Sequence, residues 1–518
     1  MREFNTAGPC NNEEHYMVDA STRLTGVEQL IDGKKYFVIH AARQSGKTTY
    51  LQDLTRRLNA TGKYYALCCS LEGMQGVVEP EKGIPEIVRK IKNELEDAEI
   101  PHCLDFAKKA DYENFTDVLR TSLTRFCKLL DKPLVILFDE VDCLGEGTLI
   151  SFLRQLRDGY NKRSITRFVH SIAIVGMRNI RDFRAQVRPD HETVGSASPF
   201  NIAKKSLTLK NFTQDEIITL YRQHTDETGQ IFNEDVIKFV FDQTQGQPWL
   251  VNAIACEVIV ELLQSDYSKP VTTELVNQAI QNIIFRRDTH IDSLLERLNE
   301  ERVRKVIEPM ILGNDYVSRD SEDFLYTRDL GLIREVGFEL EPANPIYAEI
   351  IIRKLSGDSQ RMLHNPKYPY QMPRYLSDDH IDMDILLKDF QQFWRVNSES
   401  WVEFYDYKEA APHLILMAFL QRVINGGGQV IRAMATGNGR LDLYVEYKGQ
   451  KYPVELKIWR GEKYLESGFN QIMRYMDILG SNEGWLVIFD QRKKSTWDER
   501  IFMKKEIVDG KTITIVGA

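Results

Sequence analysis

The spacing of apolar residues predicts two kinds of strand in this chain. Residues 36–40, 134–138 and 168–176 are short, nearly continuous apolar runs, as expected for strands buried on both faces of a parallel sheet. Residues 441–447 and 451–458 instead alternate apolar and polar side chains on either side of Lys448-Gly449-Gln450, which predicts a hairpin. Segments of helical periodicity follow strands of both kinds. The pattern therefore predicts an α/β protein with more than one domain.

The predicted hairpin brings ionisable residues together. Side chains in a strand alternate between the two faces of a sheet, so Glu455 and Lys457 share a face, and Asp442 lies at the start of the neighbouring strand. Carboxylates in such positions can hold Mg²⁺ or Mn²⁺, which stabilises charge on a phosphodiester and lowers the pKa of a bound water. Asp442 and Glu455 are therefore candidate metal ligands and catalytic residues. Lys457 is a candidate for orienting or deprotonating the attacking water.

Two flanking helices extend this group of residues. Gln471 and Tyr475 are four residues apart in a predicted helix over 461–480, so one face of the helix carries both. Glu409 lies near the start of an apolar segment, 407–425, which is typical of a helix and is stopped by three glycines. Gln471 and Tyr475 could therefore approach the same site, and Glu409 is a further candidate catalytic residue.

The order of these elements resembles the PD-(D/E)XK nuclease superfamily: a helix with Glu409, a strand with Asp442, a strand with Glu455 and Lys457, and a helix with Gln471 and Tyr475. The last element resembles the RecB-like branch. The resemblance covers about residues 383–518 and implies a restriction-endonuclease-like α/β fold with metal-dependent nuclease activity. The superfamily also includes inactive members. On the alternative interpretation, Glu455 and Lys457 form a surface ion pair on an edge strand, and the residues on the last helix have no chemical role.

A second group of functional residues occupies 41–49, AARQSGKTT, directly after the first predicted strand. The turn ends in Gly46, Lys47 and Thr48, as in a P-loop. Backbone N–H groups and the next helix N-terminus cradle phosphates in such a loop, Lys47 reaches the β and γ oxygens, and Thr48 ligates Mg²⁺. Ala41 stands where the motif has its first glycine, so the start of the loop could be shaped differently. The candidate ATP-binding residues of the loop are Gln44, Ser45, Gly46, Lys47, Thr48 and Thr49.

The apolar run over 134–138 supplies the second half of a nucleotide site. It ends in Asp139, expected to hold Mg²⁺ through water, and Glu140, expected to polarise the attacking water. The next apolar strand finishes shortly before Arg178 and Asn179, either of which could sense the γ-phosphate. The alternative is that both are solvated residues of a turn between a strand and a helix.

Residues 213–283 predict a helical segment that begins with a capping box of Thr213 and Glu216. Within it, Gly246, Pro248 and Trp249 come just before a helix. Together with ARQSGKTT and LFDEVD, this element resembles STAND and archaeal-type AAA-like ATPases over about residues 14–355. The resemblance implies a P-loop AAA-like parallel sheet, a helical lid with Pro248 among the cofactor-binding residues, and ATP hydrolysis with Mg²⁺.

The remaining segments complete a predicted domain organisation. Helices, a short strand pair and another helix fit a winged-helix-like domain, which in ATPases of this type either binds DNA or packs on the nucleotide domain. Three prolines within residues 363–379 predict an extended, semi-rigid linker. The predicted parts are an ATPase core over 1–212, a lid over 213–283, the winged-helix-like domain over 284–357, the linker over 358–382 and the nuclease-like domain over 383–518.

Composition limits the partners and the cellular location. Seven cysteines without CxxC spacing predict reduced thiols and no structural zinc site, and the chain shows neither a signal segment nor an apolar run long enough to span a bilayer. We therefore expect a cytoplasmic protein without membrane contact. The net charge of −9 disfavours non-specific DNA coating. Residues 383–518 are nearly neutral, however, with 19 basic and 18 acidic residues, and basic residues flank the proposed site: Arg432, Arg440, Arg460, Lys463 and Arg474.

The sequence as a whole predicts an ATP-regulated, metal-dependent nuclease that acts on nucleic acid, in the first place DNA. Its expected cofactors are ATP and Mg²⁺, or Mn²⁺ at the nuclease site, and a second copy of the chain or an effector protein is a further candidate partner. The resemblances link such proteins to prokaryotic defence against foreign DNA and to mobile elements. Two alternatives stay open. One is a regulatory ATPase whose nuclease-like domain only binds nucleic acid or a partner, and the other is a non-enzymatic assembly scaffold.

Overall fold

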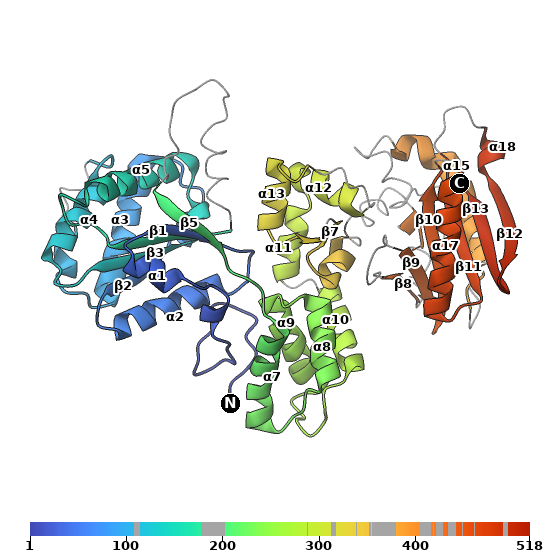
Figure 1. Cartoon of the computed structure of the whole chain (residues 1–518), viewed down its shortest axis with the longest axis horizontal. Coiled ribbons are helices and arrows are strands. Elements are labelled where there is room, and N and C mark those ends of the chain that lie inside the picture. Colours follow the sequence, from blue (N-terminus) through green and yellow to red (C-terminus); the bar gives the residue numbers. More distant parts are fainter. Residues whose placement is uncertain are drawn as a thin grey trace. The chain divides into compact units, whose positions relative to one another are not determined.

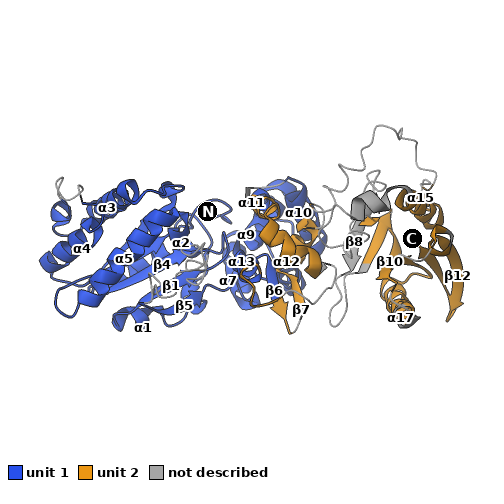
Figure 2. Cartoon of the chain, turned by 90° about the horizontal axis from the view of Figure 1, so that it is seen from above, with its two compact units in different colours: residues 1–292, 324–334 blue, residues 293–323, 335–518 orange. Residues whose placement is uncertain are grey.

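The computed structural model divides the chain into two compact units (Figure 2). One unit comprises Met1–Asp292 and Phe324–Arg334, and the other comprises Ser293–Asp323 and Glu335–Ala518. The chain therefore leaves the first unit after Asp292, returns to it at Phe324 and leaves it again after Arg334. The structure describes residues 1–107, 114–177, 202–286, 289–311, 318–337, 339–351, 354, 375, 380–402, 416–417, 419–420, 428–433, 442–447, 449–459, 462–490 and 496–518.

The first unit is built on a five-stranded parallel sheet with strand order β2-β3-β4-β1-β5 (Figure 1). Every residue of β1, β3 and β4 is buried, as the continuous apolar runs predict. The predicted parallel α/β sheet is confirmed, and β4 lies between β1 and β3. The strands are β1 (Tyr36–His40), β2 (Tyr65–Ser70), β3 (Leu134–Asp139), β4 (Ser171–Gly176) and β5 (Ala203–Thr208).

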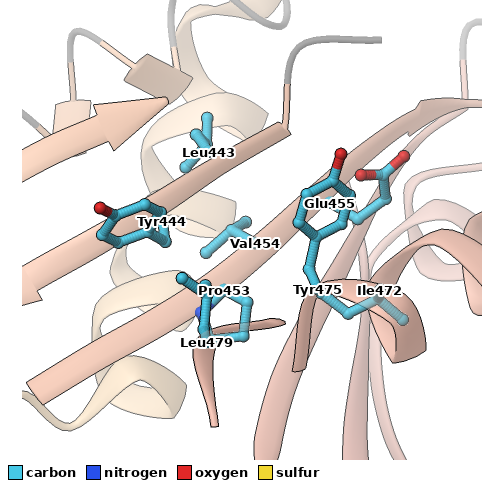
Figure 3. Close-up of a pocket in the computed structure, with 8 residues that line it drawn as sticks. All are labelled: Leu443, Tyr444, Pro453, Val454, Glu455, Ile472, Tyr475 and Leu479. Carbon is cyan, nitrogen blue, oxygen red and sulfur yellow. The ribbon is translucent and has the colours of Figure 1, made fainter. Parts of the chain in front are cut away.

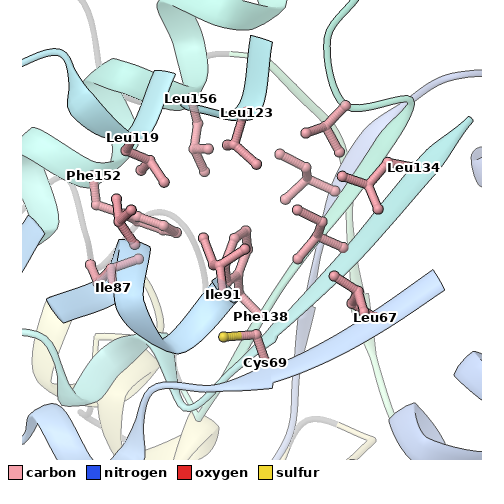
Figure 4. Packing of buried hydrophobic residues seen from close by; sticks show 14 of the residues in the cluster. Leu67, Cys69, Ile87, Ile91, Leu119, Leu123, Leu134, Phe138, Phe152 and Leu156 are labelled. Carbon is pink, nitrogen blue, oxygen red and sulfur yellow. The ribbon is translucent and has the colours of Figure 1, made fainter. Parts of the chain in front are cut away.

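Helices cover both faces of this sheet. On one face, α3, α4 and α5 form an apolar cluster with the strands, in which the rings of Phe138 and Phe152 meet edge to face (Figure 4). On the other face, α1 and α2 pack in a second cluster that includes Leu51 and Leu137. The adjacent residues Leu137 and Phe138 thus pack against helices on opposite faces of the sheet, because successive side chains of a strand point to opposite faces. The helices are α1 (Val27–Asp32), α2 (Lys47–Ala60), α3 (Pro80–Asp97), α4 (Val118–Leu129) and α5 (Glu146–Lys162).

A helical segment follows β5 where the sequence predicts a lid, and we refer to this segment as the lid. Its helices are α7 (Gln214–Thr228), α8 (Glu234–Thr244), α9 (Pro248–Cys256) and α10 (Thr273–Arg286), with a π-helix, Glu257–Leu262, after α9. The predicted capping box is present, because the Thr213 hydroxyl accepts from Glu216 N at 3.2 Å and the Glu216 carboxylate accepts from Thr213 N at 2.8 Å. Gly246 has a φ of +71°, and a Cβ there would lie 1.9 Å from the Phe212 carbonyl oxygen. Only glycine fits this turn.

The N-terminal segment, residues 1–19, contacts both the lid and the first helix after the P-loop. Phe4 is buried, and its ring lies 5.4 Å from that of Tyr221 in α7, edge to face. The backbone N–H of Cys10 donates to Thr49 Oγ1 in α2 at 3.0 Å. The segment therefore ties the lid to α2.

Three helices and a strand pair follow the lid, in the order predicted for the winged-helix-like segment. They are α11 (Thr289–Arg297), α12 (Glu301–Ile311), α13 (Glu322–Asp329), β6 (Ile333–Val336) and β7 (Glu339–Pro342). α13 from Phe324 onward and the start of β6 belong to the first unit, whereas α12 and β7 belong to the second. Most of the predicted linker lies outside the described residues, and the predicted domain boundaries remain predictions.

The C-terminal part of the second unit contains a six-stranded mixed sheet with strand order β12-β13-β11-β10-β9-β8. β9 and β10 form the predicted antiparallel hairpin, with Gly449 in its turn at a φ of +81°. The helix predicted after the hairpin is α17. The elements are α15 (Met383–Val402), β8 (Gly428–Ala433), β9 (Asp442–Tyr447), β10 (Gln450–Ile458), α17 (Glu462–Leu479), β11 (Glu483–Phe489), α18 (Trp497–Arg500), β12 (Phe502–Val508) and β13 (Lys511–Gly517).

Helices pack on both faces of this second sheet as well. Ile472 and Met476 of α17 join Leu486 in an apolar cluster on one face. Phe390 of α15 contacts Phe489 on the other face, with ring centroids 6.1 Å apart. β10 is therefore an interior strand covered by helices, and side chains on it can be buried. Among the described residues, no helix has the length and apolar character needed to cross a bilayer.

Candidate functional site

The P-loop joins β1 to α2 and takes its unusual backbone angles at two residues. Gln44 and Gly46 have φ values of +55° and +87°. Ala41 is buried and is not among the residues with positive φ. Its methyl group therefore causes no backbone strain, and the alanine in place of the first glycine leaves the turn intact.

Lys47 lies inside the loop. Its Nζ donates to the carbonyl oxygens of Ala41 at 3.0 Å and Ala42 at 2.9 Å. Burial lowers the pKa of Lys47, and the nearby carboxylates of Glu140 and Asp139 act in the opposite direction. The ammonium thus bonds the loop's own carbonyls, from a position where phosphate oxygens could replace them.

Asp139 and Thr48 come together from the two halves of the site. Thr48 Oγ1 donates to Asp139 Oδ2 at 2.7 Å, and Glu140 N donates to Asp139 Oδ1 at 3.0 Å. Burial raises the pKa of the Asp139 carboxyl, and the hydrogen bond from Thr48 partly offsets the effect. A hydroxyl and a carboxylate at this separation are oxygen donors of the kind that Mg²⁺ takes in proteins.

Glu140 follows in the left-handed region, with a φ of +54°. Burial raises the pKa of its carboxyl, and Lys47 lowers it in part. Glu140 therefore lies in the charged cluster around Lys47. This is the location expected from its place in the sequence directly after Asp139.

The other predicted nucleotide-binding residues differ in what their side chains do. Ser45 Oγ donates to the Ala42 carbonyl at 2.8 Å, and Thr49 Oγ1 accepts from Cys10 N. Both hydroxyls are thus engaged within the protein, which leaves the backbone N–H groups of these residues for a phosphate. Arg178 and Asn179 lie outside the described residues.

Two residues that sequence reasoning missed join the P-loop to the lid. The buried Arg23 donates to the Ser45 carbonyl at 3.4 Å, and Gln247 Nε2 donates to the Gln44 carbonyl at 3.4 Å. Gln247 sits directly before Pro248, the buried first residue of α9, so its place in that turn was a usable signal. Nothing in the local sequence marks Arg23.

A segment beyond the lid also reaches the P-loop. Gly331 follows α13 with a φ of +75°, and a Cβ there would lie only 2.4 Å from the Cβ of Ala42. Arg334 of the same segment donates a hydrogen bond to the side chain of Gln245, in the turn before α9. Residues 324–334 therefore touch the P-loop and the lid together.

In the C-terminal sheet, Glu455 and Lys457 form a buried ion pair on β10. Lys457 Nζ lies 2.6 Å from Glu455 Oε1, and the two residues are 5% and 1% exposed, respectively. Because β10 is an interior strand, the alternative of a surface pair on an edge strand is wrong. The other carboxylate oxygen, Glu455 Oε2, is buried and has no hydrogen-bond partner among the described residues.

α17 brings Gln471 and Tyr475 to the same place. Lys457 Nζ donates to the side-chain oxygen of Gln471. Tyr475 and Glu455 line one pocket, whose other walls are largely apolar (Figure 3). The helix can approach because Gly468 has no side chain: a Cβ there would lie 2.9 Å from Leu486 and 3.2 Å from Lys457.

The remaining predicted residues of this site are described only in part. The pairing of Leu443 with Val454 fixes the hairpin register, and continuing it by one residue places Asp442 across from Glu455. The side chain of Asp442 and the whole of Glu409 lie outside the described residues. Among the described residues no group of three or more metal-ligating side chains occurs. The unpartnered oxygen of Glu455 is nevertheless an acceptor that fits a hard cation.

The fold and the first site define a class of protein. A parallel sheet whose β1 leads into a P-loop, and whose β3 ends in Asp139 and Glu140 beside it, is the arrangement of P-loop nucleotide-binding proteins. The chain belongs to the AAA-like domain family, which its sequence matches over residues 11–352. The first unit is therefore an AAA-like P-loop ATPase domain, and its fold implies nucleotide binding.

Solved structures similar to the chain include ATPases of low sequence identity. A Walker-type ATPase of Pyrococcus abyssi is 14% identical at a TM-score of 0.46, over 67% of this chain and 99% of that chain. The RuvB Holliday junction branch migration motor of Thermotoga maritima is 12% identical at a TM-score of 0.32, over 68% and 93%. Cdc6p of Pyrobaculum aerophilum is 13% identical at a TM-score of 0.33, over 62% and 88%. No curated protein compared with the chain matches it.

Proposed function

We propose that this protein is an ATP-regulated, metal-dependent nuclease that cleaves phosphodiester bonds, in the first place of DNA. The observation that carries the proposal is the buried cluster of Glu455, Lys457 and Gln471, in which Glu455 Oε2 has no partner among the described residues. An unpaired buried acceptor costs about 1–3 kcal/mol, so a purely structural ion pair would gain by satisfying it. A bound cation would satisfy it and would explain why two carboxylates occupy neighbouring strands.

On this proposal each residue of the C-terminal site has a role. Asp442 and Glu455 hold Mg²⁺ or Mn²⁺, which when bound activates a water and stabilises charge on the phosphate. Gln471 holds the ammonium of Lys457 beside Glu455, and Lys457 orients the water or offsets the charge that develops on the phosphate. Tyr475, which lines the pocket, and Glu409 position the substrate or the water.

In the AAA-like unit, the proposal assigns ATP to the P-loop residues 44–49. Lys47 contacts the phosphates, Thr48 and Asp139 hold Mg²⁺, and Glu140 polarises the attacking water. Pro248 lies at the start of the lid helix, and Arg178 or Asn179 senses the γ-phosphate.

Control by ATP is proposed to run through residues 324–334. Their contact with Ala42 makes them sensitive to the shape of the P-loop, and the chain continues from Arg334 directly into the second unit. A nucleotide that reshapes the loop would therefore move or release this segment, and the second unit would receive the change through its covalent connection.

A cleavage assay tests the proposal. Purified full-length protein is incubated with plasmid, single-stranded DNA and RNA, with Mg²⁺, Mn²⁺ or EDTA, and with ATP, a non-hydrolysable analogue or no nucleotide. We expect metal-dependent cleavage by the wild type and none by Asp442→Ala or Glu455→Ala, while both variants still hydrolyse ATP. Glu446→Ala, on the hairpin strand β9, is the matched control and should cut like the wild type.

Failure of the wild type to cut any of these substrates under every condition would remove the nuclease assignment. If the protein then still binds DNA and hydrolyses ATP, the regulatory ATPase is the better description. For the biological role, we propose defence of a prokaryotic cell against foreign DNA or mobile elements. Phage plating on cells that carry the wild type or Glu455→Ala tests that role, and equal plating efficiencies would contradict it.

A further inference from the structure

Asp142 is a third carboxylate beside the nucleotide site, and its two oxygens differ in their surroundings. It lies in a 3-10 turn, Val141–Cys143, directly after Glu140. Asp142 Oδ2 accepts from the backbone N–H of Met177 at 3.2 Å, just past the end of β4. Asp142 Oδ1 is buried and has no hydrogen-bond partner among the described residues. The side chain therefore spans from the turn after β3 to the end of β4.

The Asp142 carboxylate occupies the space that a side chain at position 176, the end of β4, would need. A Cβ on Gly176 would lie 2.4 Å from Asp142 Oδ1 and 3.0 Å from its Cγ. Gly176 has no positive φ, so backbone conformation alone does not require glycine here. The Gly176 carbonyl also accepts from Ala41 N at 3.3 Å. Asp142, the end of β4 and the start of the P-loop are thus in direct contact.

The turn that carries Asp142 also sets the position of Glu140. Glu140 caps the turn with a left-handed backbone, and its carbonyl accepts from Cys143 N at 3.0 Å. A non-glycine residue held in this region stores roughly 1–3 kcal/mol, which neighbouring contacts must offset. The hydrogen bond from Met177 N to Asp142 fixes the far end of the same turn, and within the turn the Cys143 thiol lies 3.9 Å from Glu140 Oε2.

We propose that Asp142 is a positioning residue for ATP hydrolysis: it locks the Glu140 turn to the end of β4, so that the Glu140 carboxylate keeps its place beside the P-loop. This inference rests on the proposed ATPase activity. Asp142 acts through Glu140, and its hydrogen bond joins it to Met177 rather than to Lys47 or Thr48, so we expect ATP binding to be kept without it. A misplacement of about 1 Å can cost on the order of 100-fold in rate, so loss of the lock should reduce kcat far more than affinity.

Four variants of the full-length protein test the proposal. Asp142→Ala should lower kcat for ATP hydrolysis about 10- to 100-fold with little change in affinity for a non-hydrolysable ATP analogue. Asp142→Asn should recover most of the rate, because the amide oxygen can still accept from Met177 N. Gly176→Ala should resemble Asp142→Ala, since its methyl group displaces the carboxylate. The double variant should be no slower than Asp142→Ala, because removing the carboxylate makes room for the methyl group.

Two exposed or open positions serve as controls. Asp97→Asn, at the exposed end of α3, and Gly73→Ala, where the nearest atom to a new Cβ is the flexible end of Lys90 at 3.4 Å, should both hydrolyse ATP like the wild type. Additive losses in the Asp142→Ala/Gly176→Ala double variant would overturn the proposal. So would an Asp142→Asn variant as slow as Asp142→Ala.

Hydrogen exchange separates this inference from the proposed activity. The amide of Met177 should exchange faster in nucleotide-free Asp142→Ala than in the wild type or Asp142→Asn. Equal exchange rates in all three proteins would show that Asp142 does not hold Met177 and would overturn the proposal. A wild type without ATP hydrolysis, but with the expected exchange pattern, would instead remove the proposed ATPase activity and with it the catalytic role of the lock.

Discussion

Replacing Lys457 by Met should destabilise the C-terminal domain and at the same time make it more responsive to metal. The substitution keeps the length and apolar stem of the side chain but removes the ammonium, which lies 2.6 Å from Glu455 Oε1. Glu455 is 1% exposed, so its carboxylate would be left in the interior with Oε2 already unpartnered among the described residues.

The size of the effect follows from this burial. Removing one partner of a buried ion pair costs about 3–5 kcal/mol, because the other charge stays uncompensated. For a domain of this size, that corresponds to a fall in Tm of roughly 10–20 °C. A cation bound to Glu455 would replace the lost charge, and at a concentration 100 times its Kd it would restore about 2.7 kcal/mol. Lys457 no longer repels the cation in the variant, so its metal affinity should equal or exceed that of the wild type.

Thermal unfolding of the full-length protein in EDTA and in Mn²⁺ measures both effects, and a cleavage assay in the same buffers measures activity. We expect Lys457→Met to unfold early in EDTA, to recover more in Mn²⁺ than the wild type does, and to cut no substrate. Lys451→Met, an exposed position on the same strand, should stay within about 1 kcal/mol of the wild type. A variant that is destabilised but gains nothing from Mn²⁺ would refute Glu455 as a metal ligand.

Three further predictions concern the AAA-like unit. Lys47→Ala should abolish tight ATP binding, and Glu140→Gln should keep binding but stop turnover. Calorimetry measures the binding and phosphate release measures the turnover, with Glu146→Gln as the control. Turnover at the wild-type rate by Glu140→Gln would contradict the catalytic role of Glu140. Gly331→Ala should push residues 324–334 away from Ala42 and weaken any effect of ATP on cleavage. Gly337→Ala is the control, because a Cβ there meets nothing within 4 Å, and it should leave the effect of ATP unchanged. Adding Ala42→Gly to Gly331→Ala should restore the effect of ATP. Burial lowers the pKa of His290 to about 4, so the folded state binds fewer protons than the unfolded state and stability should fall between about pH 6.5 and 4, by up to about 3 kcal/mol. A pH series of urea unfolding should show this loss in the wild type and not in His290→Gln.

The two halves of the P-loop site could be predicted because the residues of each half are contiguous in the chain. Lys47 and Thr48 follow one apolar strand, Asp139 follows another, and parallel strands place both ends at one edge of the sheet. The hairpin of β9 and β10 was equally accessible, because strand alternation is a local signal. Alternation also predicts that Glu455 and Lys457 share a face. It could not show that the pair is buried, since that depends on which strands flank β10.

Contacts between distant segments could not be predicted. Arg23 reaches the P-loop only because the lid and the sheet meet around it, and no local pattern distinguishes it from an exposed arginine. Asp142 is part of the recognisable motif LFDEVD, but its contact with Gly176 depends on β4 lying next to β3, which the motif does not show. Gly331 likewise meets Ala42 only because the chain returns to the first unit after α12. In each case the packing of whole elements decides the role of the residue.

The N-terminal segment limits how freely the lid can swing. Any large rotation of α7 away from α2 must either pull Phe4 out from beside Tyr221 or break the hydrogen bond from Cys10 to Thr49. Exposing a buried phenylalanine costs roughly 1.5–3 kcal/mol, so a lid opened by withdrawing Phe4 would be populated at about one molecule in ten to one in two hundred. Nucleotide exchange would then depend on the release of this N-terminal segment, which lies some two hundred residues from the lid in sequence. Removing the residues before Cys10, Phe4 among them, would speed exchange while the bond from Cys10 to Thr49 of the P-loop is kept.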